Sequence, residues 1–392
     1  MNGLEPCRSD VPSATAGIYL HIPFCQRRCI YCDFFSSTDS GKKAEYVDAL
    51  CRELVLRKGY LNGRTIATVY FGGGTPSQLA ATDFQRIFDT IHTHFRVCPS
   101  AEITLEANPD DLTEAYLKSL SSLPFNRLSM GIQTFHEETL RLLRRRHTAV
   151  QAIAAFHRCR QAGFHNLSID LMYGLPGETQ ERWEADLQQA LELQPEHISA
   201  YHLIYEEGTA LWQLREQHRV SEADEELSLS LFKQLIHRLR ENGYEQYEIS
   251  NFCRPGFPSR HNSSYWDGTP YLGCGAAAHS FDGTSRQWNV ASIDGYIQGI
   301  RKGVPDTERE ELDLATRYND CIVTAMRTRR GISLSRLRQE FGKELADYCL
   351  QMARPHLEQG MLEISNDRLR LTEEGIFVSD GIMSDMMFVN EE

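Results

Sequence analysis

The chain has 392 residues, which is the length of two or three domains or of one large barrel with an appended unit. Hydrophobic residues make up 41% of the chain and charged residues 24%, so a substantial core can form without disulfides or metals as staples. The net charge of −13 argues against a protein that coats nucleic acid, and no run of about 18 apolar residues is available to cross a bilayer.

Strand patterns and helix patterns alternate six times between residues 17 and 205. Helix-start signals separate several of the segments, as at Asn108, which follows the third strand. This alternation predicts a parallel sheet with its helices on the outside. The predicted strands are 17–22, 65–71, 102–106, 127–132, 166–173 and 197–203, and the predicted helices are 43–57, 82–94, 137–144, 149–162 and 179–193.

These strands alternate between apolar and polar residues instead of being apolar throughout. In the first strand, Ile18 and Leu20 share one face, whereas Tyr19 and His21 share the other. The third and fifth strands repeat the pattern, with Asp170 on the polar face of the fifth. A doubly wound sheet would be apolar on both faces, so the alternation favours a barrel with a hydrophilic interior.

The chain is predicted to divide into four regions. The mixed region after the barrel contains a predicted long helix, 221–242, a strand, 244–250, and a stretch rich in glycine and aromatic residues. The regions are an N-terminal extension, 1–16, the barrel, 17–205, the mixed α/β region, 206–304, and a C-terminal domain, 305–392.

Three predicted helices and a hairpin follow one another in the C-terminal domain, at 313–326, 334–341, 346–359 and 361–371. This order resembles a winged helix, an α+β unit that binds DNA in some proteins and packs against protein in others. The domain carries 11 basic and 18 acidic side chains, so its net charge is −7. We therefore expect it to cover the barrel or meet a protein partner, and we expect no nucleic acid as a partner.

Eleven cysteines are an unusual number for a chain with no apolar secretory signal at its N-terminus. An odd count is a poor basis for a disulfide framework, and we expect a reducing cytoplasm with most thiols buried. Cys25, Cys29 and Cys32 form a C-x3-C-x2-C motif directly after the first predicted strand. Three thiolates suit a [4Fe–4S] cluster with one iron left open. The alternative is coincidence, or a zinc site that borrows a fourth ligand.

A glycine-rich segment, Gly72–Pro76 with the sequence GGGTP, follows the second predicted strand. It is not a Walker loop, because no Gly-Lys-Ser/Thr follows. Such backbone can approach a ligand closely and present N–H groups to it, although a tight turn is an equal alternative. Polar side chains lie near the same ends of the other strands, and jointly they suit a zwitterionic ligand that carries a sugar. They are Glu106, Gln133, Asp170 and, after the next helix, Arg145.

Six motifs resemble those of the radical S-adenosylmethionine (SAM) superfamily. They are YLHIPFCQRRCIYC, FGGGTPS, LEANPD, NRLSMGIQTF, IDLMYGLPGET and HNSSYW, and together they cover nearly the whole chain. Within the superfamily they are similar to the group that contains oxygen-independent coproporphyrinogen III dehydrogenase and the HemW-like heme chaperones. The resemblance implies a partial (β/α)6 barrel in which three cysteines ligate three irons of a [4Fe–4S] cluster.

The same resemblance implies that the amino and carboxylate groups of SAM chelate the fourth iron. Reduction of the cluster can then cleave SAM to a 5′-deoxyadenosyl radical, so the cofactor supplies the difficult chemistry. The positions that match the family's SAM contacts are Tyr19, Tyr31, Gly73, Gly74, Thr75, Glu106, Gln133, Arg145 and Asp170.

Two departures distinguish the subgroups of the family. The dehydrogenase has a fourth cysteine where this chain has Phe34, and the HNxxYW motif of the heme-linked group is present here from His261 to Trp266. Both departures point to a heme chaperone that binds heme and transfers it to acceptor proteins. The sequence does not identify the acceptors, and respiratory proteins are one candidate. The alternative is an enzyme of porphyrin biosynthesis that decarboxylates coproporphyrinogen III, and the sequence leaves open whether the chain is an enzyme.

His261 is the candidate heme ligand, with Tyr265 and Trp266 as flat walls, and a capping role in a buried turn is the equal alternative. His279 equally could face the cavity, whereas Cys253 and Cys274 are expected to be buried structural thiols. The expected cofactors are thus the [4Fe–4S] cluster, SAM and heme. A monomer and a homodimer, and peripheral membrane contact, all fit the sequence.

Overall fold

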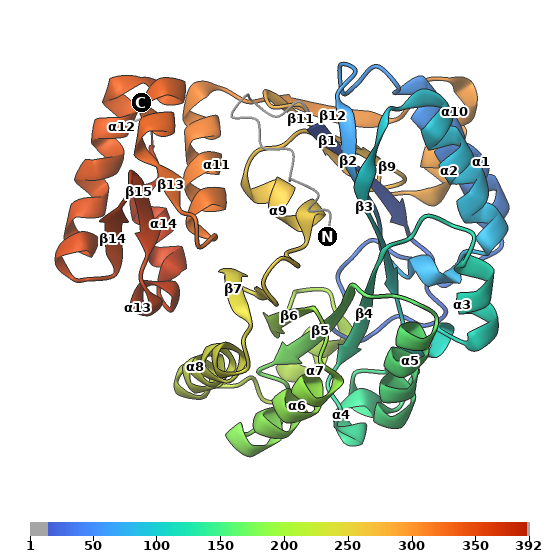
Figure 1. The fold of residues 1–392 in the computed structure, drawn as a ribbon, viewed down its shortest axis with the longest axis horizontal. Helices are drawn as coiled ribbons and strands as arrows, with labels where there is room; N and C mark the ends of the chain where they lie inside the picture. Colours follow the sequence, from blue (N-terminus) through green and yellow to red (C-terminus); the bar gives the residue numbers. More distant parts are fainter. Residues whose placement is uncertain (1–14, 390–392) are drawn as a thin grey trace, which may run out of the picture.

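The computed structural model describes residues 15–389, which form one long, curved sheet with a helical domain beside it (Figure 1). The predicted N-terminal extension therefore lies almost wholly outside the described residues. The sheet has twelve strands in the order β12-β11-β10-β9-β1-β2-β3-β4-β5-β6-β8-β7. Its central strands are β1 (Thr15–Ile22), β2 (Thr65–Gly73), β3 (Val97–Ala107), β4 (Arg127–Gln133), β5 (Leu167–Tyr173) and β6 (His197–His202).

The six central strands pair in parallel and in chain order, which confirms the partial (β/α)6 barrel. Their alternation places apolar residues such as Ile18 and Leu105 in the main hydrophobic core, where both are fully buried. The helices of the barrel cover the outer face (Figure 1). They are α1 (Lys43–Leu56), α2 (Ala81–His94), α3 (Glu114–Leu120), α4 (Glu137–Leu142), α5 (Ala149–Gln161) and α6 (Gln180–Leu193).

Strands of the mixed region extend both edges of the barrel. Strand β9 pairs in parallel with β1, and β8 pairs antiparallel with β6. Helix α9 lies on the concave side of the sheet (Figure 1). The elements are α7 (Ala210–Glu216), α8 (Glu225–Glu241), β7 (Glu245–Glu248), β8 (Asn251–Cys253), α9 (Arg260–Trp266), β9 (Tyr271–Cys274), β10 (His279–Phe281), β11 (Ser285–Asn289), α10 (Ile293–Lys302) and β12 (Thr307–Glu311). Because β12 pairs with β11, residues 307–311 belong to the main sheet.

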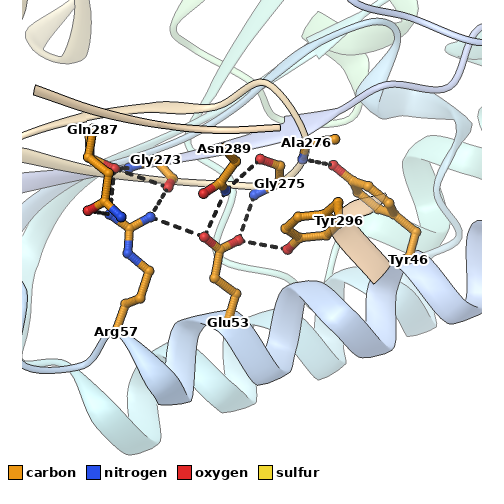
Figure 2. Close-up of polar contacts among 10 residues, drawn as sticks. Tyr46, Glu53, Arg57, Gly273, Gly275, Ala276, Gln287, Asn289 and Tyr296 are labelled. Atoms are coloured by element: carbon orange, nitrogen blue, oxygen red, sulfur yellow. Dashed lines mark hydrogen bonds and ion pairs between the residues drawn. The ribbon is translucent and has the colours of Figure 1, made fainter. Parts of the chain in front are cut away.

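A buried polar network ties these added strands to α1 (Figure 2). Glu53 is fully buried, and its carboxylate accepts four hydrogen bonds. The donors are Gly275 N (2.8 Å), Asn289 Nδ2 (2.8 Å), Tyr296 Oη (2.7 Å) and Arg57 Nη1 (3.1 Å). A buried carboxylate is tolerated only when it is paired and fully hydrogen-bonded, so this network specifies how α1 sits against β9 and α10.

The C-terminal domain has a hydrophobic core of its own and a three-stranded antiparallel sheet, ordered β13-β15-β14. Helix α12 changes direction at Gly342, whose φ of 85° separates the two helices that the sequence predicts there. The order of helices and hairpin is that of the predicted winged helix, and two short helices that were not predicted follow it. The elements are α11 (Leu314–Met326), β13 (Ile332–Ser333), α12 (Leu334–Glu358), β14 (Leu362–Ser365), β15 (Arg368–Leu371), α13 (Glu373–Ile376) and α14 (Ser379–Met386).

The C-terminal domain joins the main sheet beyond β7. Ile249 N donates to Arg327 O, and Arg329 N donates to Tyr247 O, both at 3.1 Å. The guanidinium of Arg327 also pairs at 3.1 Å with the buried carboxylate of Glu248. The loop after α11 therefore covers the edge of the sheet, which would otherwise present unpaired backbone groups. Within residues 15–389, none of the helices has the length and apolar character needed to cross a membrane.

Candidate cofactor-binding site

The three motif cysteines lie on the loop that leaves β1. Backbone hydrogen bonds from Cys25 N to Ser37 O (2.9 Å) and from Ser37 N to Pro23 O (2.7 Å) close the base of this loop. All three thiols are partly exposed. Burial, with smaller contributions from the neighbouring Cys29 and Cys25, raises the pKa of Cys32 to about 11.

This donor set fits a [4Fe–4S] cluster better than a single ion. Across residues 15–389, no three His, Cys, Asp or Glu side chains converge closely enough to hold one metal ion. A cube does not require such convergence, because each of its thiolates binds a different iron. The positive charge of a metal would also stabilise thiolates that burial otherwise disfavours.

The GGGTP segment packs directly against the cysteine loop. Gly73 has a φ of +106°, and a Cβ on it would lie 2.6 Å from a ring carbon of His21. A Cβ on Gly74 would lie 2.9 Å from the carbonyl carbon of Pro23 and 3.1 Å from Cys25 Sγ. Thr75 completes the contact, because its hydroxyl donates to Cys25 Sγ at 3.4 Å. Only glycine therefore fits at these two positions.

Two carboxyl groups, Glu106 of β3 and Asp170 of β5, occupy the inner face of the barrel. Tyr70 Oη donates to Glu106 Oε1 at 2.6 Å, and Ser129 Oγ donates to Asp170 at 3.4 Å. Burial raises the pKa of Glu106 to about 7 and that of Asp170 to about 6, and the charge of Asp170 adds to the shift of Glu106. Both residues are largely but not completely buried.

Arg145 connects the cysteine loop to the barrel. Its Nη1 donates to Cys29 Sγ at 3.3 Å, and its Nη2 donates to Asn108 Oδ1 at 2.8 Å and to Gly131 O. Nε has no hydrogen-bond partner although it is buried. Gln133 lies beside it and has a φ of +75°, where β4 makes an irregular step against β5. A positive φ is uncommon in a residue other than glycine, and here it falls at a residue of the predicted site.

The two predicted tyrosine contacts have different surroundings. Tyr19 faces the barrel interior, and its hydroxyl lies 3.1 Å from His21 Nδ1. Tyr31 packs in a small apolar cluster with Leu143 and Leu203, and burial raises its pKa. The charge of Arg145 acts on Tyr31, which places the phenol near the guanidinium.

His261 lies deep inside the barrel, at the start of α9. It is 1% exposed, and its ring stacks on that of Tyr70 with centroids 4.9 Å apart. Nδ1 lies 2.8 Å from Thr68 Oγ1, and Nε2 lies 2.9 Å from Tyr265 Oη. Both ring nitrogens are therefore engaged within the protein in this arrangement. Burial lowers the pKa of His261 to about 3, so its imidazole is neutral.

The other residues singled out in the sequence have simpler surroundings. Phe34, at the position of the dehydrogenase's fourth cysteine, is 65% exposed on the cysteine loop. His279 is exposed on β10 and stacks on Trp288 at 5.8 Å. Cys253 and Cys274 are buried thiols, as expected.

Sequence reasoning missed two inner-face residues that the structure brings to the site. Tyr70 of β2 holds Glu106, and Arg127 of β4 is a buried cation between the strands that carry Glu106 and Asp170. Each is spaced by two residues from other residues of the polar face on its own strand. The two-residue period of a strand, which predicted the polar face, would therefore also have predicted these two residues.

The cysteine loop, the glycine segment and the carboxyl groups on a partial barrel define a radical SAM protein. The family model described as the Radical SAM superfamily matches residues 19–190, and that of the HemN C-terminal domain matches residues 312–378. Both fall where the structure has the barrel and the C-terminal domain.

Curated relatives and a solved structure identify the family within that class. The chain is 34% identical to the heme chaperone HemW of Bacillus subtilis, over 91% of this chain and 95% of the relative. It is 31% identical to the mitochondrial radical S-adenosyl methionine domain-containing protein 1 of Bos taurus, over 96% and 88%. The radical SAM enzyme coproporphyrinogen III oxidase (HemN) of Escherichia coli matches with a TM-score of 0.82 and 25% identity, over 96% and 91%. The chain belongs to the HemW family of the radical SAM superfamily.

Proposed function

We propose that this protein is a heme chaperone that binds heme, transfers it to acceptor proteins and carries a SAM-coordinated [4Fe–4S] cluster. The observation that carries the proposal is the likeness to HemW of Bacillus subtilis over nearly the full length of both chains. Two features of this chain support it: Phe34 stands where the dehydrogenase has its fourth cysteine, and the HNSSYW segment forms a helix inside the barrel.

We propose Cys25, Cys29 and Cys32 as the ligands of three irons. A bound cluster supplies the electron that can cleave SAM, and the residues of this chain bind and orient the two. Arg145 and Gln133 suit the SAM carboxylate, while Glu106 and Asp170 suit its ammonium group and ribose hydroxyls. The ligand would meet the backbone of the glycine segment at Gly73, Gly74 and Thr75, and the two glycines leave no room for a side chain there. The flanking walls would be formed by Tyr19 and Tyr31.

His261 remains the proposed heme ligand, and the structure defines what ligation would require. Nε2 must release Tyr265 Oη, or Nδ1 must release Thr68 Oγ1, before either nitrogen can bind iron. Movement of α9 away from β2 would release Nδ1 from Thr68, whereas Tyr265 lies on α9 itself and would move with His261.

We propose the reducing cytoplasm as the location and heme-acceptor proteins, respiratory ones among them, as the partners. All ten described cysteines are free thiols, which supports a reducing compartment. The C-terminal domain, with its acidic balance, is a candidate surface for the acceptor.

The likeness to coproporphyrinogen III oxidase (HemN) favours a second candidate, the oxidative decarboxylation of coproporphyrinogen III. The test is anaerobic reconstitution with iron and sulfide, followed by addition of SAM, a reductant and either hemin or coproporphyrinogen III. We expect hemin to bind at micromolar concentration and no protoporphyrinogen to form. Formation of protoporphyrinogen would favour the second candidate, and failure to bind hemin would contradict the first.

A further inference from the structure

Arg127 is the first residue of β4, and its side chain lies on the inner face of the barrel. It shares that face with Ser129, which donates to Asp170, and with Gly131, whose carbonyl accepts from Arg145. The Arg127 side chain is 1% exposed, which makes it one of the largest fully buried side chains of the protein.

This buried guanidinium is not satisfied within the protein. Arg127 Nε and Nη1 have no hydrogen-bond partner. Thr104 is its direct neighbour on β3 in the register of the two strands, and the hydroxyl of Thr104 is also buried without a partner. Buried polar groups of natural proteins are nearly always hydrogen-bonded, and exceptions mark an absent ligand, ion or water. Two such groups on adjacent strands form a cluster of unused donors.

The ionisable groups around Arg127 include two imidazoles and two carboxyl groups, and Asp170, with a pKa of about 6, is mostly ionised at pH 7. Burial and the charge of Arg127 lower the pKa of His261 to about 3, and the same two causes lower that of His197, so both imidazoles are neutral. Glu106 and Asp170 feel the charge of Arg127, yet their pKa values are raised to about 7 and 6. Neither carboxyl group is hydrogen-bonded to Arg127 Nε or Nη1.

The inward side chains of β4 are small between Arg127 and the mouth of the barrel. Between Arg127 and Gln133, the inward positions of β4 are the small residues Ser129 and Gly131. Glu106 and Asp170 at this level are largely but not completely buried. An anionic arm that follows β4 to Arg127 would pass these two small residues, Ser129 and Gly131, and it would require Gln133 Nε2 and Arg145 Nη2, which border Gly131, to move aside.

We propose that Arg127 and Thr104 form a binding site for a carboxylate of the ligand, beside the proposed SAM contacts. A guanidinium binds a carboxylate in two parallel hydrogen bonds through Nη2 together with either Nε or Nη1, and the threonine hydroxyl adds a third donor. This inference rests on the proposed function and specifies it further: the carboxylate is a propionate of heme.

The test compares hemin with hemin dimethyl ester, in which both propionates are uncharged. The wild-type protein should bind the ester at least about tenfold more weakly, because a charged, buried hydrogen-bonded pair is lost. Arg127→Gln should bind hemin about tenfold more weakly than the wild type and should no longer distinguish the two ligands. Arg127→Lys keeps the charge without the planar fork and should show intermediate discrimination, and Thr104→Val should reduce it less.

Arg158→Gln is the matched control, because Arg158 lies on the outer helix α5 and donates to Leu112 O at 2.9 Å. It should discriminate as the wild type does. Circular dichroism establishes that each variant is folded, and Arg127→Lys carries the test if the glutamine variant does not fold. If the folded Arg127 variants still prefer hemin over its dimethyl ester as strongly as the wild type does, the unused donors bind internal water and the proposal is overturned. Equal binding of hemin and the ester by the wild type would also overturn it. Failure of the wild type to bind hemin would instead overturn the proposed function.

Discussion

Replacement of Tyr70 by Phe should shift the pH dependence of SAM binding to higher pH. Burial raises the pKa of Glu106 to about 7, and the hydrogen bond from Tyr70 opposes this rise by stabilising the carboxylate. Phe keeps the ring that stacks on His261 but removes the O–H donor. One hydrogen bond to a charged group is worth about 1.4 kcal/mol or more, so the pKa of Glu106 should rise by about one unit.

The size of the effect follows from the fraction of Glu106 that is ionised. With a pKa of about 7, about 10% is ionised at pH 6, half at pH 7 and about 90% at pH 8. If only the carboxylate binds SAM, affinity rises about tenfold between pH 6 and 8. A shift of one unit in Tyr70→Phe lowers affinity about fivefold at pH 7 and leaves it nearly unchanged at pH 9.

The affinity is measured by anaerobic titration calorimetry of the cluster-loaded protein between pH 6 and 9. Tyr116→Phe is the control, because Tyr116 Oη donates to Leu79 O at 3.3 Å, on another part of the barrel. A loss of affinity that is equal at every pH would refute the electrostatic reasoning and assign the effect of Tyr70 to packing. A flat profile in the wild type would show that the ionisation of Glu106 does not control SAM binding.

The same pKa has a consequence for stability without SAM. The folded pKa of Glu106 lies above its ordinary value of 4.5, so the folded state binds the proton more tightly than the unfolded state. Stability should therefore fall as pH rises from 4.5 to 7, by about 3 kcal/mol. The loss should be complete above pH 7, and it should be smaller in Glu106→Gln, which thermal unfolding at each pH would measure.

Three further substitutions test the cluster, the fold and the heme site. Cys29→Ala should abolish the brown cluster absorbance and SAM cleavage, and a retained [4Fe–4S] spectrum would refute the ligand assignment. Glu53→Ala should destabilise the fold by about 3–5 kcal/mol in thermal unfolding, because Arg57 would be left buried without its ion-pair partner. The control is Glu45→Ala, which removes an exposed ion pair and should cost less than about 1 kcal/mol. His261→Ala should weaken heme binding or shift the Soret band, and an unchanged spectrum and affinity would remove it as a ligand.

Local periodicity was enough to predict the barrel. In β1, Ile18 and Leu20 alternate with Tyr19 and His21, and this alternation shows which side of the strand faces the core. The eight residues of β1 are enough to show it. The contact of the cysteine loop with the glycine segment also follows from local signals, because both lie at the carboxyl ends of adjacent parallel strands. The short strands β9 to β12 gave weak patterns, so their addition to the edge of β1 was not predicted.

The sequence by itself determined the parallel barrel, its polar interior and the loop that carries the cysteines, since each depends on neighbouring residues and strand order. Only the tertiary structure decided which distant side chains meet. Arg145 reaches Cys29 across 116 positions, Glu53 binds Asn289 across 236, and His261 uses both ring nitrogens within the barrel. Such contacts arise from the packing of whole elements, and the unused donors of Arg127 became visible only once every neighbour had been placed.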